Sequence, residues 1–479
     1  MGTALRRNQA LVATIGIILL LFGVVVTRME PKVWVSIMLS GLTLGALYFL
    51  VAAGLSLIFG LMDVLNFAHG TIFMIGAYVG YTFFTEPGRF FGWVPIVLAL
   101  GSGLLLMPLT GPSLVRWHAR GRWVRWLLLI TSLAVLWVIF FGTGRLGLGT
   151  LPPPMALVIT AAAAILLGGA LADARTDQEV VPAARLRILA AAGGALAAAL
   201  LLGALRPPLA AWVGASSTNL RFLLALLAGA SSGALLGAAM EWGLIRPLYS
   251  RPLYQVLMTL GLVFVGDELV KSIWGPTGFP MGRPEFFDGR CRAESLAVWL
   301  SEHCASIDIL GRAFATYRLF IIGLGLLLLV GVGLLLQRSR IGMIIRAGVQ
   351  DRQMVEALGI NVSAVFTGVF AFGAALAALG GVAAAPFIGV SPSMGLEYQL
   401  QAFIVVVLGG MGSYPGAALG AALVGLARAF GDHFVLSGIA LPGMAEATRL
   451  SPAIARASTV LVMAVFLLVR PAGIFGKKE

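Results

Sequence analysis

Polar side chains interrupt an otherwise apolar run near the start of the chain. Asp63, Asn66 and His69 lie between Gly60 and Gly70 in the sequence GLMDVLNFAHG. A carboxylate and an imidazole at this spacing could exchange protons or line a polar path, but in an apolar segment they cost free energy unless they face a partner or water. Two interpretations stay open. The three residues mark a helix break at a translocation pathway or gate, or they form a short turn in which Asp63 and Asn66 cap a helix that begins near His69.

A second polar segment runs from Gly389 to Gly425 and contains eight glycines. Glu397, Gln399 and Gln401 stand near its beginning. We expect broken or re-entrant helices here, because interrupted helices expose backbone groups to a substrate pathway. A tightly packed, glycine-rich helical hairpin is the alternative. The pathway residues predicted from this segment are Glu397, Gln401, Gly409, Gly410 and Gly412.

A third group of ionisable residues, Asp267, Glu268 and Lys271, lies in the sequence GLVFVGDELVKSIWG. Asp267 and Lys271 are four residues apart, so they can pair along one face of a helix. A stand-alone ion-coupled carrier would use acids deep in the membrane, here Asp267 or Asp63. We favour the simpler interpretation, in which these residues pair with one another near the outer end of an apolar span.

The sequence lacks the motifs that enzyme chemistry would need. It contains no HExxH motif, and its four histidines do not have the spacing of metal ligands. It also contains no G-x-x-x-x-G-K-[ST] loop to hold ATP. We therefore predict that the chain is not an enzyme and holds no metal or cofactor of its own. Any ATP that drives it is bound by partner subunits.

Composition places the chain in a membrane. Of its 479 residues 59% are hydrophobic and 11% charged, and the mean hydropathy is +0.97. A soluble domain of this length could not bury so much apolar surface. We predict an all-α polytopic membrane protein with about 12 to 14 transmembrane helices, some of them broken or re-entrant. The net charge of +13 does not indicate nucleic-acid binding, because the basic residues are scattered over short loops.

The predicted spans follow from the apolar segments. Residues 11–26 form a retained first span, since no signal-peptide cleavage site follows them. The further spans are 34–59, 70–84, 94–109, 126–141, 154–171, 188–206, 220–243, 254–274, 317–337, 363–385, 398–411, 415–431 and 456–470. Loops assigned to the inside carry more Lys and Arg than loops assigned to the outside, which places both ends of the chain in the cytoplasm.

Two loops are distinctive. The outside loop 275–316 contains both cysteines, Cys291 and Cys304, as a disulfide or as two unpaired thiols. The inside loop 337–361 reads QRSRIGMIIRAGVQDRQMVEALGIN and carries four arginines. We expect a short amphipathic helix in it, ended by Gly359 in a left-handed cap. Its apolar face is predicted to contain Val349, Met354, Val355 and Leu358.

Several separate motifs carry a resemblance to a known family. They are GLTLGALYFL (41–50), VLNFAHGTIFMIGAYVGY (64–81), IRAGVQDRQMVEALGINV (345–362), SPSMGLEYQLQAFIVVVLGGMGSYPGAALGAALVGL (391–426) and LLVRPAGIFG (467–476). In this order they resemble the inner-membrane permeases of branched-chain amino acid ABC transporters, of the LivH type. The resemblance covers about residues 34–90 and 220–476.

The resemblance implies an ABC importer permease fold and a set of partners. These are a second permease subunit of the LivM type, two cytosolic ATPase subunits, a periplasmic substrate-binding protein and membrane lipid, in a bacterial inner membrane. It implies uptake of branched-chain or related amino acids, with amides or urea as the alternative. It also implies that a coupling helix docks on the ATPase. The matching positions are Arg346, Gln350, Asp351, Arg352, Glu356, Ala357 and Gly359.

The chain departs from the family pattern in its central part. About 130 residues with four candidate spans separate the motifs near Tyr81 from the span at 220–243. We therefore predict four parts: an extra N-terminal helix (1–33), an N-terminal permease part (34–92), an inserted four-helix block (93–219) and a C-terminal permease part (220–479). The last part contains the outside loop 275–316 and the coupling loop 338–362.

Overall fold

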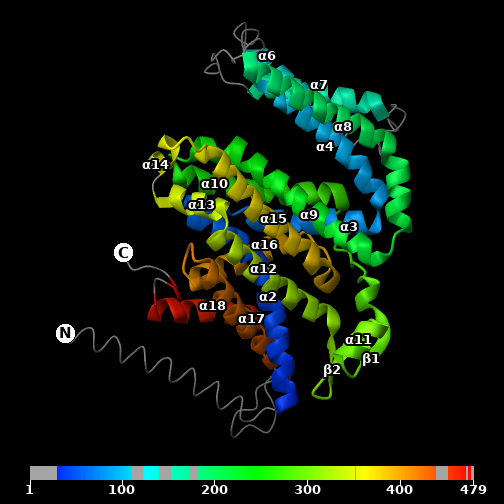
Figure 1. Cartoon of the computed structure of the whole chain (residues 1–479), viewed down its shortest axis with the longest axis vertical. Helices are drawn as coiled ribbons and strands as arrows, with labels where there is room; N and C mark the ends of the chain where they lie inside the picture. Colours follow the sequence, from blue (N-terminus) through cyan, green and yellow to red (C-terminus); the bar gives the residue numbers. More distant parts are fainter. Residues whose placement is uncertain are drawn as a thin grey trace, which may run out of the picture. The chain divides into compact units, whose positions relative to one another are not determined.

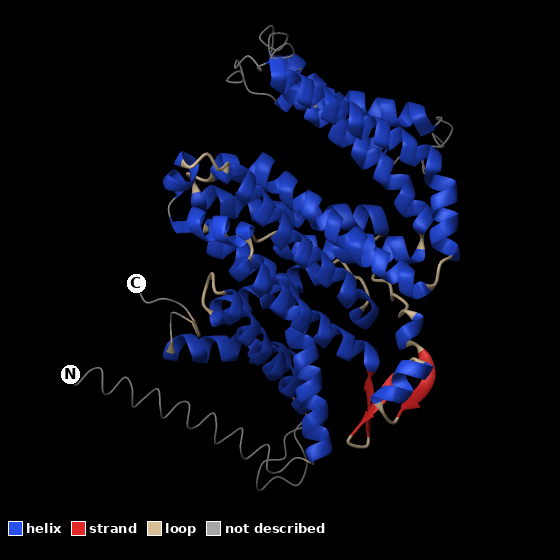
Figure 2. Cartoon of the chain, in the orientation of Figure 1, coloured by secondary structure: helices blue, strands red, loops and turns tan. Residues whose placement is uncertain are grey.

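A computed structural model describes residues 30–109, 122–139, 153–171, 182–350, 352–437, 451–470 and 473–475. Helices make up nearly all of these residues, and Figure 2 shows one small sheet beside them. The predicted first span at 11–26, Asp351 of the coupling loop and the basic end of the chain lie outside the described residues.

The thirteen spans predicted from residue 34 onward all fall on helices (Figure 1). These helices are α2 (Pro31–Met62), α3 (His69–Thr85), α4 (Pro87–Leu105), α6 (Arg122–Trp137), α7 (Pro153–Leu171), α8 (Pro182–Ala215), α9 (Thr218–Met240), α10 (Pro252–Trp274), α12 (Thr316–Arg338), α15 (Val362–Ile388), α16 (Met394–Gly409), α17 (Tyr414–Ser437) and α18 (Pro452–Val469). Within the described part, seven helical segments are long and apolar enough to cross a membrane, and four shorter apolar helices accompany them. The predicted all-α polytopic class is confirmed.

The chain divides into two compact units. Unit 1 comprises Met1–Tyr81 and Thr218–Glu479, and unit 2 comprises Thr82–Ser217. Within unit 2, α4 packs along α7 and α8, and α6 packs on α7. The hydroxyl of Ser102 on α4 donates to the carbonyl oxygen of Ala192 on α8 at 2.8 Å. This buried bond joins α4 directly to α8.

Helix α8 runs through the Pro207-Pro208 pair, which directly follows the predicted span 188–206. Each proline removes a backbone hydrogen bond, which normally kinks or ends a helix. Here Arg206, the residue before the pair, donates from Nε to the carbonyl oxygen of Gly88 on α4 at 3.1 Å. Contacts with α4 thus hold the helix where its own hydrogen bonds are missing.

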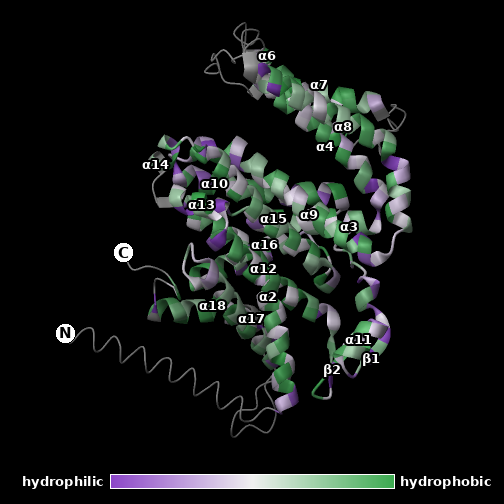
Figure 3. Cartoon of the chain, viewed as in Figure 1, coloured by the Kyte–Doolittle hydropathy of each residue, from purple (hydrophilic) through white to green (hydrophobic). Residues whose placement is uncertain are grey.

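Unit 1 is built around α2, which packs along α15, α16 and α17. Glycines bring these helices into backbone contact. A Cβ added at Gly54 of α2 would collide with the carbonyl oxygen of Gly373 on α15, and one at Gly425 of α17 would collide with the backbone of Gly45 on α2. Such small-residue contacts drive helix association where lipid offers no hydrophobic gain. Figure 3 shows hydrophobic residues over most of these helices, while hydrophilic ones gather at α13 (Arg340–Gln350) and α14 (Arg352–Ala357).

Loop 275–316 folds into a small sheet that the sequence did not predict. Strands β1 (Gly289–Ala293), β2 (Cys304–Ile309) and β3 (Arg312–Ala315) lie in the order β1-β2-β3, parallel and then antiparallel. Helix α11 (Leu296–Glu302) connects the first two strands.

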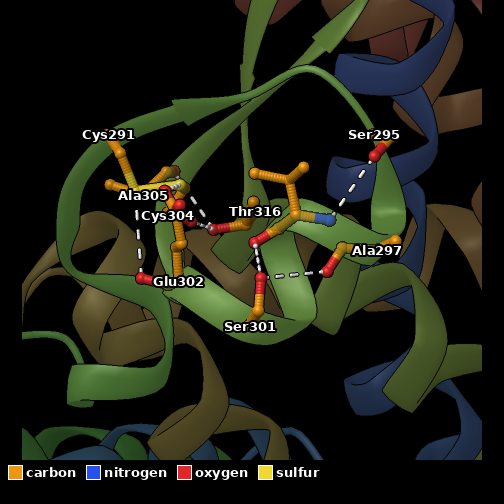
Figure 4. The surroundings of a disulfide bond; sticks show 9 residues. Cys291, Ser295, Ala297, Ser301, Glu302, Cys304, Ala305 and Thr316 are labelled. Carbon is orange, nitrogen blue, oxygen red and sulfur yellow. Dashed lines mark hydrogen bonds between the residues drawn. A yellow bond between two sulfur atoms is a disulfide. The ribbon is translucent and has the colours of Figure 1, made fainter.

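A disulfide between Cys291 and Cys304 joins β1 to β2 (Figure 4). The hydroxyl of Thr316, the first residue of α12, donates to the carbonyl oxygen of Cys304 at 2.9 Å. The sheet is thereby anchored directly on a membrane helix.

Substitution of Gly381 on α15 tests the glycine contacts. We expect Gly381→Ala to destabilise the fold by roughly 1–3 kcal/mol, because the methyl group would collide with the carbonyl oxygen of Phe73 on α3. Gly331→Ala on α12 is the matched control, since an added Cβ there meets nothing within 4 Å. The measurement is the midpoint of thermal unfolding in detergent. Equal midpoints for the two variants would contradict the close contact between Gly381 and the backbone of Phe73.

Candidate functional site

The segment between α2 and α3 is the break that the sequence suggested. Helix α2 ends at Asp63, which is exposed and left-handed (φ 53°) and donates its N–H to the carbonyl oxygen of Phe59 at 2.9 Å. Asn66 accepts the N–H of Ala68 on Oδ1 at 3.0 Å, just before α3 begins at His69. The interpretation in which both residues cap α3 is therefore wrong for Asp63, which terminates the preceding helix instead.

Gln399 of α16 ties this junction to a distant part of the chain. Its Oε1 accepts the N–H of Gly70 at 2.6 Å, and its Nε2 donates to the carbonyl oxygen of Asn66 at 3.4 Å. The N–H groups of a helix's first turn have no partner within the helix, so a side chain has to supply one when they are buried. Sequence reasoning noted Gln399 but did not place it in the site. The only signal was its position two residues before Gln401.

Several buried polar atoms at and near the junction make no hydrogen bond within the described part of the chain. They are both ring nitrogens of His69, Nδ2 of Asn66, Oγ of Ser56 and Oε1 of Gln401. His69 is fully buried, and the carbonyl of Val51 lies toward its ring without a hydrogen bond of normal geometry. Unpaired polar groups in a protein interior are costly and uncommon, which makes this junction a candidate functional site.

The three predicted pathway glycines, Gly409, Gly410 and Gly412, lie around the end of α16. Helix α16 ends at Gly409, and Gly410 (φ 97°) and Gly412 (φ 80°) take conformations that favour glycine. A Cβ on Gly60 of α2 would lie 2.7 Å from the Cα of Gly412. Glu397, in contrast, lies on an exposed face of α16.

The C-terminal segment closes this turn. Ile474 donates its N–H to the carbonyl oxygen of Leu408 at 2.9 Å, and Phe475 donates to that of Gly409 at 3.0 Å. The last carbonyls of a helix need such external donors. The terminal motif around Gly473 thus caps α16, a role that the sequence did not indicate.

The described residues of the coupling loop form helices α13 and α14 on either side of Asp351. Gly359 ends α14 with φ 80° and donates to the carbonyl oxygen of Glu356 at 3.0 Å, so the predicted left-handed cap is confirmed. Of the residues predicted for its apolar face, Val355 is buried, while Met354 (59% exposed) and Leu358 (73%) are exposed. Met354 and Leu358 are one helical turn apart, so they lie on the same side of the helix.

The predicted coupling residues lie on or beside these helices. Arg346 is on α13 and reaches the carbonyl oxygen of Leu336. Glu356 and Ala357, at the end of α14, are exposed. The structure describes only the backbone of Gln350 and Arg352.

Comparison with known proteins identifies the family. The profile of the family described as "Branched-chain amino acid transport system / permease component" matches residues 37–165 and 186–470. The chain belongs to this family. The high-affinity branched-chain amino acid transport system permease protein LivH of Escherichia coli (strain K12) is 28% identical over 262 residues, 53% of this chain and 76% of the relative. The corresponding protein BraD of Pseudomonas aeruginosa is 38% identical over 155 residues, 32% of this chain and 45% of the relative. No solved structure matches the chain.

In this permease the third ionisable group forms a local ion-pair cluster. Lys271 Nζ lies 2.6 Å from a carboxylate oxygen of Asp267 and 3.0 Å from one of Glu268, all on α10. Each of these side chains is partly or largely exposed. The pairing agrees with the simpler interpretation, in which these residues pair with one another. The carboxylate of Asp267 is bound to Lys271.

Two glutamines on α16 offer a matched test of the junction. Both are buried, but Gln399 holds the N–H of Gly70, whereas Oε1 of Gln401 has no partner among the described residues. We expect Gln399→Leu to destabilise the permease by ~1–3 kcal/mol, because it leaves a buried N–H unpaired. Gln401→Leu is expected to leave stability unchanged or to raise it.

The functional readout separates a structural glutamine from a pathway glutamine. If Gln401 serves the pathway, Gln401→Leu lowers substrate uptake several-fold without lowering the thermal midpoint, since functional groups are kept at a cost in stability. A destabilised Gln401→Leu variant with unchanged uptake per folded molecule would reject this role.

Proposed function

We propose that this permease takes up branched-chain or related amino acids as a subunit of an ABC importer. The observation that carries the proposal is the family match, which spans most of the chain and includes the junction, the coupling loop and the capped end of α16. The named relatives are permease proteins of high-affinity branched-chain amino acid transport systems. The chain has no Walker A sequence, so the energy has to come from separate subunits.

The proposed assembly follows from the same assignment. A second permease subunit completes the pathway, two cytosolic ATPase subunits supply the energy, and a periplasmic binding protein delivers the amino acid. In a bacterial inner membrane, the disulfide-bonded sheet would face the oxidising periplasm. The arginine-rich loop with α13 and α14 and both ends of the chain would then lie in the cytoplasm.

We propose residues 93–219 as a block added to the permease. Nearly all of this segment lies in unit 2, which packs around its own apolar cluster of Ala99, Leu157, Ala161 and Ala199. The alignment with LivH of E. coli covers 76% of the relative but only 53% of this chain, as expected if additional residues are present here.

Reconstitution tests the proposed function. The permease is co-expressed with its neighbouring transport subunits, purified as a complex and placed in proteoliposomes with the binding protein. We expect uptake of radiolabelled leucine, isoleucine or valine that requires ATP inside the vesicle. Uptake driven by an ion gradient without any ATPase subunit would support the carrier interpretation and reject ours. Uptake of amides or urea but not amino acids would correct the substrate class.

The coupling loop provides a second test. We expect Leu358→Asp to reduce ATPase binding and uptake at least tenfold, because the exposed leucine is suited to insert into an apolar groove of the ATPase. Glu356→Arg and Gly359→Pro should act in the same direction, the latter because proline cannot adopt the positive φ of this cap.

Leu310→Asp is the matched control for Leu358→Asp. Leu310 is 59% exposed and lies in the turn between β2 and β3, on the side proposed to be periplasmic. This variant should bind the ATPases as the wild type does. Co-purification of tagged ATPase subunits measures the difference. If Leu358→Asp co-purifies with them as the wild type does, the loop is not part of the proposed interface.

A further inference from the structure

A buried carboxylate lies where α9 ends. Glu241 is fully buried and begins a turn of π-helix, η2 (Glu241–Ile245), which is followed by the short 3-10 helix η3 (Arg246–Leu248). Arg246 binds it in bidentate fashion, with Nη2 to Oε2 at 2.8 Å and Nε to Oε1 at 3.1 Å. The hydroxyl of Tyr249 donates to Oε1 at 2.7 Å. The wide π turn allows both partners to reach the carboxylate from the same short segment.

The same pair also holds α15. The hydroxyl of Thr367 lies 2.7 Å from Oε2 of Glu241, and Nη2 of Arg246 donates to the carbonyl oxygen of Ser363 at 3.3 Å. Both residues belong to the first two turns of α15. We call Glu241, Arg246, Tyr249 and Thr367 the clamp, because they bind the end of α9 to the start of α15.

The clamp adjoins the coupling loop along the chain. Helix α14 is followed by the cap at Gly359 and by Asn361, whose Oδ1 accepts the N–H of Ala364 at 3.0 Å as the N-cap of α15. Few residues therefore separate α14 from Ser363, and they are fixed by caps on both sides. A displacement of α14 is therefore passed to the clamp through only a few residues, which are held in place by these caps.

On its other side the clamp meets the polar junction between α2 and α3. Ile245 directly precedes Arg246 in the chain. It forms one buried cluster with Ile58, Val64 and Phe370 of α15. Val64 belongs to the segment that carries Asn66. A continuous set of packed residues thus runs from the coupling loop to the candidate pathway.

The clamp differs from the other ion pairs in the described part of the chain. Arg428 and Asp432 pair within α17, and Lys271 pairs within α10, so these contacts hold no second helix. Among the ion pairs of the described residues, the clamp alone contains a fully buried carboxylate. Separating a buried carboxylate from its partners is strongly unfavourable, so the two helix ends it joins should move as one body.

We propose that Glu241, Arg246 and Thr367 are positioning residues that transmit movement of the coupling loop to the α2–α3 junction. The inference rests on the proposed function, since it presumes an ATPase that moves this loop. The clamp carries motion in both directions, so substrate at the junction also affects ATP hydrolysis through it.

The test uses the complete transporter in proteoliposomes and measures amino acids taken up per ATP hydrolysed. Glu241→Gln and Thr367→Val are expected to lower this ratio at least tenfold and at least threefold, respectively. Yield of the complex and basal ATP hydrolysis should stay within twofold of the wild type. Thr367→Ser keeps the hydroxyl and should restore the wild-type ratio.

Tyr249→Phe is the matched control for Thr367→Val. It removes a bond of the same length from the same carboxylate, but the Tyr249 hydroxyl binds Glu241 on the α9 side of the clamp, and phenylalanine keeps the ring that contacts Phe366 of α15. The control should keep a near-normal ratio. Asp432→Asn, in the single-helix pair of α17, should keep it as well.

The outcomes distinguish failure of the proposed function from failure of the inference about the clamp. A wild-type complex without ATP-dependent amino acid uptake overturns the proposed function and the inference with it. A working wild type in which Thr367→Val and Tyr249→Phe have equal effects, or in which uptake and ATP hydrolysis fall in proportion, overturns the inference alone. If Glu241→Gln does not assemble, Thr367→Val and Thr367→Ser decide the question.

Discussion

Interrupted helices in an apolar interior depend on distant hydrogen-bond partners. Neither lipid nor an apolar core can satisfy a free N–H or carbonyl group, so each helix break requires a partner from the protein. Gln399 supplies one at the start of α3, and the backbone of Ile474 and Phe475 supplies two at the end of α16. Residues more than three hundred positions apart are joined at the junction. The breaks therefore exist only in the assembled fold.

Close backbone packing makes these long-range bonds geometrically accessible. Gly70 leaves no room for a Cβ against Gly395 and Gln399 of α16, and Gly60 touches Gly412. With larger side chains the helices would separate, and an amide as short as that of Gln399 would not span the gap. The glycines thus do more than pack helices, because they bring the polar partners within hydrogen-bond distance. In this core, close helix packing and the pairing of buried polar groups therefore depend on each other.

Sequence reasoning located the helices because hydrocarbon thickness imposes a length that hydropathy reveals directly. It also placed the cap at Gly359, since only glycine fits a positive φ so readily. It missed the β1–β3 sheet, whose strands of four to six residues are too short to show alternation. It missed Glu241 because the bonded Thr367 is 126 positions away and nothing local marks the pair. The sequence left two interpretations of Asp63 open for a similar reason, as a lone acid fits either side of a turn.

The buried polar groups of unit 1 fall into two kinds, and the distinction has mechanical meaning. Glu241 and Gln399 have their partners inside the protein, so the elements they join must travel together in any rearrangement. The ring nitrogens of His69 and Oε1 of Gln401 have none among the described residues. A transporter that alternates between two arrangements can tolerate an unpaired group in one of them if the other arrangement, water or the solute supplies its partner. The buried groups with hydrogen-bond partners then mark the helices that move together. The buried groups without partners mark the places where those helices separate.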